Sequence, residues 1–226
     1  MTSLIIATKN VHKLEEIRLI LGNKFRYLSL KEFPDAPAVK EDQATLQKNA
    51  IKKAKELAKW LNYLPGADFR IPGASASVLA DDSGLEVDAL NGAPGVHSAR
   101  FAALDSGSGA NASNTPDADN NAKLLQLLKD VPLEKRTARF RCVLSLIVVK
   151  PPQPMLAGQL FEGTCEGKIA LAPSGKGGFG YDPLFLPAGY PQSFAELTPG
   201  VKNSISHRAK ALANMKKYME SLIMWG

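Results

Sequence analysis

The amino-acid sequence predicts an α/β fold, because short apolar segments typical of buried strands alternate with amphipathic segments typical of helices. Leu4–Ala7 has the composition of a buried strand, and Val11–Leu21 follows it with apolar residues at helical spacing. The strand pattern returns at Phe25–Leu30, and Thr45–Leu61 has one apolar helical face. The other faces of that helix carry lysines typical of a solvated surface: Lys48, Lys52, Lys53, Lys55 and Lys59.

The second half of the chain continues this alternation. A helix is expected at Asn121–Leu128, and the strict alternation of Thr137–Val149 predicts a long strand. One further helix with a continuous apolar face is expected at Asn203–Leu222. Asn62–Ser77 and Ala103–Asp119 lack a periodic apolar pattern, so they are expected to be loops.

Composition places the chain among ordinary globular proteins. Hydrophobic residues make up 45% and charged residues 22% of the 226 residues, a length that suits one substantial domain or two small lobes sharing a cleft. No apolar run approaches the ~20 residues of a membrane helix, and the first residues lack a secretory pattern. Two cysteines form no disulfide framework, so the cytoplasm is expected. The net charge of +6 suits a polyanionic partner, either a nucleotide triphosphate or a nucleic acid, but a surplus of this size is equally common in proteins that bind neither.

An acidic stretch, Leu79–Phe101, is the first candidate site. The apolar run Val78–Ala80 delivers Asp81 and Asp82 to an expected break at Ser83–Gly84, as α/β proteins present ligand-binding residues at the carboxyl end of a strand. Successive side chains on a strand point to opposite faces, so one aspartate at most can face a given cleft. An acidic turn with solvated carboxylates is the alternative for such a pair.

A second candidate site is the connection between the first strand and the first helix. Thr8, Lys9 and Asn10, followed by Lys13, supply a hydroxyl, an amide and cations at the positive end of a helix, which suits an anion. Asn10 is also a good helix N-cap, and both roles can hold together.

The glycine-rich segment Pro173–Pro183 is a third candidate. It is not a dinucleotide fingerprint, because the proline that follows Tyr181 and Asp182 prevents an immediate helix. It is not a Walker A loop either, because that loop needs Gly-Lys-Ser/Thr after four spacer residues. Such a loop brings backbone close to a ligand, with Phe179 and Tyr181 available to stack on a flat ring and Asp182 to accept hydrogen bonds. A hairpin with packed aromatic side chains is the alternative.

Cationic residues near the start of the last helix form a fourth candidate. His207 and Arg208, with Lys202 nearby, are a donor-rich group that suits a phosphate or the carbonyl of a base. A structural histidine is the alternative for His207.

Five segments in order along nearly the whole chain resemble the inosine triphosphate pyrophosphatase family, the non-canonical purine nucleoside triphosphate pyrophosphatases. The segments are Ala7–Lys13, Asn49-Ala50 with Lys53-Ala54, Leu79–Ala102, Gly177–Phe185 and Ala195–Leu212.

This resemblance implies a fold, an activity and a set of partners. The implied fold is an α/β fold in which helices flank an elongated mixed β-sheet and two lobes enclose a central cleft. It is implied to be a single domain over residues 1–226, and the protein is implied to be a homodimer. The implied activity is Mg²⁺-dependent hydrolysis of ITP, dITP and XTP to the monophosphate and pyrophosphate, a house-cleaning of the nucleotide pool. A purine nucleoside triphosphate is the expected partner, without nucleic acid or membrane.

Residue roles follow from the same resemblance. Asp82 is the implied proton acceptor and metal ligand, and Glu41 is the implied second metal ligand. The implied phosphate-binding residues are Thr8, Lys9, Asn10, Val11, His12 and Lys13. Ser83 is implied to contact the nucleotide. The implied base pocket comprises Phe179, Gly180, Tyr181, Asp182 and Lys202, completed by His207 and Arg208. Because Lys40-Glu41-Asp42-Gln43 stands where many relatives have Glu-Glu-Thr-Gly, Asp42 competes with Glu41 as the ligand.

The chemistry of the residues agrees with this activity. Carboxylate oxygens can hold Mg²⁺ against phosphates while a base accepts a proton from water, and cations neutralise the charge of the leaving group. A related enzyme for another nucleotide, such as a modified pyrimidine, is one alternative. A nucleotide- or nucleic-acid-binding protein without catalysis is another, although carboxylates repel phosphates unless a cation intervenes.

Overall fold

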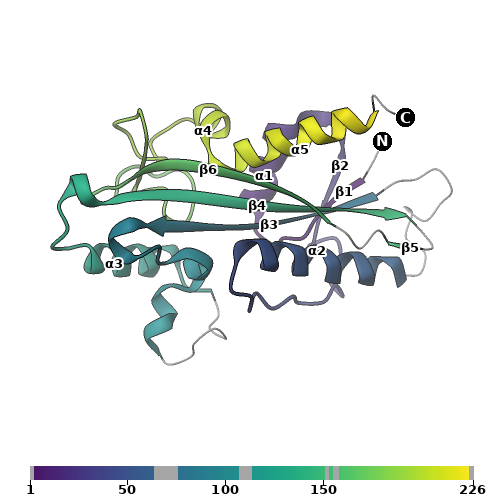
Figure 1. The fold of residues 1–226 in the computed structure, drawn as a ribbon, viewed down its shortest axis with the longest axis horizontal. Helices are drawn as coiled ribbons and strands as arrows, with labels where there is room; N and C mark the ends of the chain where they lie inside the picture. Colours follow the sequence, from purple (N-terminus) through teal and green to yellow (C-terminus); the bar gives the residue numbers. More distant parts are fainter. Residues whose placement is uncertain (1–2, 64–75, 107–113, 151–152, 155–157, 224–226) are drawn as a thin grey trace. The chain divides into compact units, whose positions relative to one another are not determined.

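A computed structural model describes residues 3–63, 76–106, 114–150, 153–154 and 158–223 (Figure 1). The chain divides into two compact units, one formed by Met1–Asp82, Val143–Glu162 and Ala211–Gly226, the other by Ser83–Cys142 and Gly163–Lys210. No helix of the described residues is long and apolar enough to cross a membrane. The prediction of a single domain over 1–226 and that of a central cleft stay predictions.

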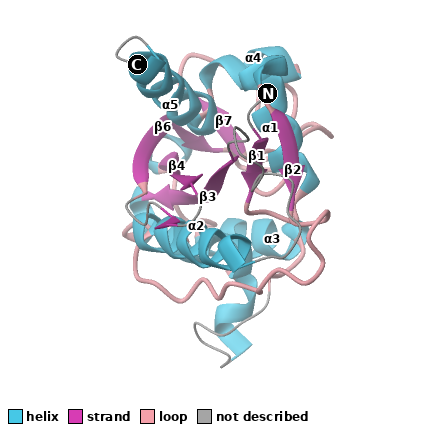
Figure 2. Cartoon of the chain, turned by 90° about the vertical axis from the view of Figure 1, so that its right-hand side faces the viewer, coloured by secondary structure: helices cyan, strands magenta, loops and turns pink. Residues whose placement is uncertain are grey.

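The strands form a mixed sheet in the order β2-β1-β3-β4-β6-β7, with β5 paired to β4. Their bounds are β1 Ser3–Ile6, β2 Arg26–Ser29, β3 Ala76–Val87, β4 Thr137–Lys150, β5 Gln153–Pro154, β6 Gln159–Ile169 and β7 Phe185–Pro187. β1 is parallel to β2 and β3, whereas β5 and β7 are antiparallel to β4 and β6. With helices flanking these strands (Figure 2), the predicted α/β class is confirmed.

In the first unit, two long helices lie on opposite sides of the strands (Figures 1 and 2). They are α2, Leu46–Tyr63, and α5, His207–Ile223, of which the part after Lys210 belongs to this unit. The apolar face of α2 packs in a buried cluster with Val78, Ala80 and Ile147, because its apolar residues recur every three or four positions. The shorter helix α1, Val11–Leu21, begins and ends where the sequence predicts.

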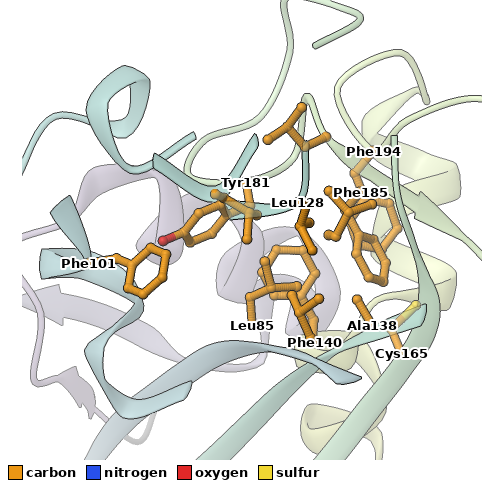
Figure 3. Close-up of a cluster of buried hydrophobic side chains, with 13 residues drawn as sticks. Leu85, Phe101, Leu128, Ala138, Phe140, Cys165, Tyr181, Phe185 and Phe194 are labelled. Atoms are coloured by element: carbon orange, nitrogen blue, oxygen red, sulfur yellow. The ribbon is translucent and has the colours of Figure 1, made fainter. Parts of the chain in front are cut away.

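The second unit holds the short helices and a core rich in aromatic residues. Its helices are η3 Asp88–Leu90, η4 Gly95–Arg100, η5 Ala102–Ser106, α3 Asp117–Leu127, η7 Leu133–Lys135 and α4 Pro199–Ile205. The short helix η1, Gly22–Lys24, belongs to the first unit. Phe140, Phe185 and Phe194 lie in contact at its centre, with ring centroids 4.7–6.1 Å apart (Figure 3). Leu85, Leu128 and other buried side chains complete this cluster.

The expected break after Asp82 is wrong. β3 continues from Ala76 to Val87 through Asp81, Asp82 and Ser83, so the acidic residues lie within a strand and not at its end. Gly84 is required here for close approach, because a Cβ at this position would collide with the backbone oxygen of Gly95. β3 therefore carries Asp82 as the last residue of the first unit and Ser83 as the first residue of the second.

The ends of the two expected loops belong to helices and strands. α2 runs to Tyr63 and β3 begins at Ala76, so only residues 64–75 between them lie outside the described residues. In the stretch expected between Ala103 and Asp119, η5 occupies residues 102–106 and α3 begins at Asp117, while residues 107–113 lie outside the described residues.

The prediction of a single helix over Asn203–Leu222 is also wrong, because α4 ends at Ile205 and α5 begins at His207. Ser206 has an extended backbone with ψ of 158°, and its N–H donates to Lys202 O at 2.9 Å to close α4. Its side-chain oxygen accepts a hydrogen bond from Ala209 N at 3.1 Å, as an N-cap does. His207 and Arg208 consequently occupy the first turn of α5.

We expect Ser206→Ala to lower the free energy of unfolding by about 1 kcal/mol, because the cap of α5 is lost. Ser204→Ala is the matched control, since Ser204 is exposed on α4 and its hydroxyl only donates to Val201 O. Urea unfolding followed by circular dichroism measures both. Equal stability of the two variants would contradict the capping role.

Candidate functional site

The adjacent aspartates of β3 contact different lysines, as the alternation of strand side chains predicts. Asp81 Oδ1 pairs with Lys13 Nζ at 2.5 Å, and Asp82 Oδ1 pairs with Lys53 Nζ at 2.8 Å. Both carboxylates are buried, with exposed fractions of 3% and 5%. A solvated acidic turn is therefore not what this pair forms.

Lys53 is the centre of the acidic cluster in the first unit. Its Nζ donates to Asp82 Oδ1 at 2.8 Å, to the backbone oxygen of Asp81 at 2.7 Å and to Glu41 Oε1 at 3.1 Å. The prediction that Lys53 lies on a solvated face of α2 is wrong, because only 7% of the residue is exposed. A lysine buried in this way needs carboxylate partners, and here it has two.

Burial and charge act together on this ion pair. Burial on its own would lower the pKa of Lys53, but the carboxylates of Asp82 and Glu41 outweigh it and raise the pKa, so the ammonium keeps its proton. Burial, together with the nearby carboxylate of Glu41, raises the pKa of Asp82, although the charge and hydrogen bond of Lys53 act to lower it. A carboxylate with a raised pKa is a better proton acceptor than an exposed one.

Glu41 and Asp42, adjacent in the sequence, form ion pairs with different lysines. Asp42 pairs with Lys52 at 2.8 Å, and hydrogen bonds from Lys52 and Gln43 lower its pKa to about 2. Glu41 instead lies at Lys53, together with Asp82. The backbone N–H of Gln43 donates to Asn49 Oδ1 at 3.0 Å, which fixes this segment to α2.

The acidic cluster fits a divalent ion by its donor set. Asp82 Oδ2 is buried and has no hydrogen-bond partner among the described residues, so this oxygen can contact a ligand while Oδ1 stays on Lys53. Hard carboxylate oxygens of this kind are preferred Mg²⁺ ligands. Among the described residues no group of three or more His, Cys, Asp or Glu side chains lies together, so a bound Mg²⁺ would also keep water ligands.

The connection between β1 and α1 has the predicted capping geometry. Asn10 Oδ1 accepts hydrogen bonds from the backbone N–H groups of His12 at 2.9 Å and Lys13 at 3.3 Å, and Thr8 Oγ1 accepts from Asn10 N at 3.1 Å. Lys9, Val11 and His12 are exposed around this turn. Asn10 is thus confirmed as an N-cap, and anion binding by residues 8–13 stays a prediction.

In the second unit, several of the predicted residues gather around Phe179. Asp182 Oδ2 accepts hydrogen bonds from Phe179 N at 2.8 Å and from Lys202 Nζ at 2.6 Å. Lys202 Nζ lies 4.9 Å and Arg208 Cζ 5.8 Å from the centroid of the Phe179 ring, and Arg208 Nη2 donates to Ser83 Oγ at 3.4 Å. The structure therefore brings these five residues into one group.

Tyr181 and His207 have packing roles in the same unit. Tyr181 is 4% exposed, its hydroxyl donates to Ser98 O at 2.9 Å, and burial raises its pKa. Its ring lies in the hydrophobic cluster (Figure 3), so the expectation that it is available to stack on a ligand is wrong. His207 is 4% exposed and its ring stacks on Phe140 at 4.7 Å. The ring of Phe179 is less buried than those of Tyr181 and His207.

Lys53 is the functional candidate that the sequence reasoning missed. Leu46, Ala50, Lys53 and Leu57 follow the spacing of three and four residues that marks the buried face of α2. This spacing in the sequence could have predicted that Lys53 is buried, because a lysine on the same helical face as buried residues is buried with them.

The fold and these side-chain groups define the class: an α/β protein with a buried carboxylate and lysine centre in one unit and a cationic aromatic group in the other. A model of the Ham1 family matches residues 4–218. The chain therefore belongs to the Ham1 family, which confirms the resemblance found in its motifs.

Relatives of known name match almost the full length. A protein of Geobacter sulfurreducens named dITP/XTP pyrophosphatase is 47% identical over 220 residues, covering 97% of both chains. The dITP/XTP pyrophosphatase of Geobacillus kaustophilus is 42% identical over 224 residues, covering 99% of this chain and 97% of its own. The structure of a HAM1 protein from Coxiella burnetii superposes with a TM-score of 0.76 at 35% identity, covering 98% of this chain and 100% of that one.

We expect Lys53→Met to lower the free energy of unfolding by about 3–5 kcal/mol, because two carboxylates lose the ammonium that compensates them. Lys52→Met is the matched control on the same helix, and it removes only the more exposed pair with Asp42. Denaturant unfolding at neutral pH compares them. A Lys53→Met protein as stable as the control would refute the central role of the ammonium.

Proposed function

We propose that this protein is a Mg²⁺-dependent pyrophosphohydrolase that converts dITP, XTP and ITP into the nucleoside monophosphate and pyrophosphate. The observation that carries the proposal is the buried cluster of Lys53, Glu41 and Asp82 in a chain that belongs to the Ham1 family. Two close relatives bear the name dITP/XTP pyrophosphatase. In this proposal the protein is a homodimer in the cytoplasm. Its role is to remove deaminated purines from the nucleotide pool.

In the proposed reaction, water adds to a phosphorus atom of the triphosphate and the bond between the α- and β-phosphates breaks. Asp82 accepts the proton of the attacking water as a general base. Lys53 holds Asp82 through Oδ1 and keeps Oδ2 in a fixed orientation. When bound, Mg²⁺ would be held by Asp82 and Glu41 and would neutralise charge on the phosphates.

Cations complete the proposed phosphate site. Lys13 lies in the first turn of α1, where the helix dipole also favours an anion, and Asp81 fixes its ammonium. Lys9 and His12 add exposed donors beside it. These groups stabilise the charge that grows on pyrophosphate as it leaves.

The second unit supports recognition of the base in this proposal. The partly buried ring of Phe179 offers a face for stacking, and Lys202 and Arg208 supply donors. Hypoxanthine and xanthine carry a 6-oxo acceptor where adenine carries an amino donor. A site of buried donors rejects the amino group, because each unpaired donor costs about 1–3 kcal/mol.

We expect ITP, XTP and dITP to be hydrolysed far faster than ATP and dUTP, and only with a divalent ion present. The purified protein is incubated with each triphosphate, with Mg²⁺ or with EDTA, and the products are separated by anion-exchange chromatography. Preferred turnover of dUTP would favour an enzyme for pyrimidine nucleotides. Diphosphate and orthophosphate as products, or salt-sensitive RNA binding without turnover, would refute the proposal.

We expect the acidic residues to differ in their effects on this reaction. Asp82→Asn abolishes turnover, because the amide neither accepts the proton nor binds Mg²⁺ as a carboxylate does. Glu41→Gln raises the Mg²⁺ concentration needed for half-maximal rate by about tenfold, as loss of one ligand predicts. Asp42→Asn is the matched control and stays near wild type, since Asp42 pairs with Lys52. A reversed order of Glu41 and Asp42 would reassign the ligand.

A further inference from the structure

The backbone of Gly180 is held on both sides by side chains of α3. Its N–H donates to Asp117 Oδ2 at 2.6 Å, and its carbonyl oxygen accepts from Asn121 Nδ2 at 3.0 Å. Asp117 and Asn121 are four residues apart and therefore lie on the same face of the helix. Gly180 has a φ of +63°, a left-handed conformation that glycine adopts readily.

These two hydrogen bonds of Asp117 and Asn121, called the Gly180 clamp below, also restrain the backbone of the neighbouring Phe179. The N–H of Phe179 is fixed by Asp182, and the next peptide is fixed by α3, so the backbone on both sides of the ring has a charged or amide partner. Tyr181, the residue after Gly180, is anchored by its hydroxyl on Ser98 O. The orientation of the Phe179 ring beneath Lys202 is therefore determined in part by residues that do not touch it.

α3 is itself firmly attached within the second unit. Asn120 Oδ1 accepts from Ala102 N at 2.9 Å and from Thr115 Oγ1 at 2.7 Å, and Lys123 Nζ donates to Phe101 O at 2.8 Å. At its end, Arg136 donates to the carbonyl oxygen of Leu128 at 2.7 Å. A helix held in this way can impose its position on the loop that it contacts.

We propose that Asp117 and Asn121 are positioning residues that orient Phe179 for stacking on the base, and so contribute to the affinity for the purine. This inference rests on the proposed function, because it concerns the same base-recognition group. Neither residue belongs to the binding residues implied by the family motifs. Their effect passes through the Gly180 peptide, so it should be felt in binding of the base and not in the bond cleavage at the phosphates.

The test compares four variants with wild type. Asp117→Ala removes the acceptor for Gly180 N, and Asp117→Asn keeps an oxygen acceptor at the same place. Asn121→Asp replaces the donor by a carboxylate that repels the Gly180 carbonyl oxygen. Asp119→Asn is the matched control, because this exposed residue lies in the same first turn of α3 and its removal changes the charge without affecting Gly180.

We expect Asp117→Ala and Asn121→Asp to raise the KM for ITP about tenfold with kcat within about twofold of wild type. Asp117→Asn restores most of the affinity, and Asp119→Asn behaves as wild type. Inhibition by inorganic tripolyphosphate, which lacks a base, stays unchanged in all four. Amide hydrogen exchange of the peptide containing residues 177–183 becomes faster in Asp117→Ala and Asn121→Asp only.

Several results would overturn the inference. They are an unchanged KM in folded Asp117→Ala and Asn121→Asp, a fall in kcat without a change in KM, an equal loss in Asp119→Asn, or a failure of Asp117→Ala to fold. These results differ from failure of the proposed function, in which the wild-type protein itself leaves ITP intact. The hydrogen-exchange comparison tests the clamp in either case, since it requires no substrate.

Discussion

The buried ammonium group of Lys53 is the constraint on which the candidate site depends. It joins α2 to β3 and to the segment of Glu41 through three oxygen atoms within 3.1 Å. A carboxylate as buried as Asp82 cannot stay ionised without a partner of opposite charge, and two carboxylates as close as Asp82 and Glu41 repel each other. Lys53 meets both needs at once.

The same ion pair leaves part of Asp82 available. Lys53 donates to Oδ1, whereas Oδ2 has no hydrogen-bond partner in the part of the chain that the structure describes, so the two oxygens of this carboxylate have different environments. The ion pair fixes the orientation of the side chain, and the second oxygen can contact a ligand without the pair being broken. Rigid support of a reactive group by a neighbouring interaction is what preorganisation requires.

Local sequence predicted the elements whose signals are local. Val11–Leu21 was placed correctly, because Asn10 caps the helix and Gly22 ends it. The long strand β4 was also found from its alternation, although both of its faces are buried from Cys142 to Ile147. Family membership followed from motifs, which depend on residue identity and not on packing.

Elements decided by tertiary contacts were missed. Asp81 to Gly84 has the composition of a turn, yet β3 continues through it, between β1 and β4 in the sheet and close to the backbone oxygen of Gly95. The break at Ser206 was missed since Ser is tolerated inside helices, and only the cap to Ala209 N shows its role. Tyr181 looked available for stacking, but the size of the aromatic core that surrounds it cannot be read from its own loop.

The charges of the candidate site in the first unit favour the binding of a divalent ion. The candidate cations Lys9, Lys13 and Lys53 are equal in number to the carboxylates of Glu41, Asp81 and Asp82, so the group has no net charge with which to attract a triphosphate. A polyanion approaching buried carboxylates is repelled at short range unless a cation lies between them. In the second unit, Lys202 and Arg208 lie beside Phe179 with Asp182 as the partner of Lys202, and a neutral base needs no further cation there. The requirement for metal is therefore expected at the phosphates and not at the base.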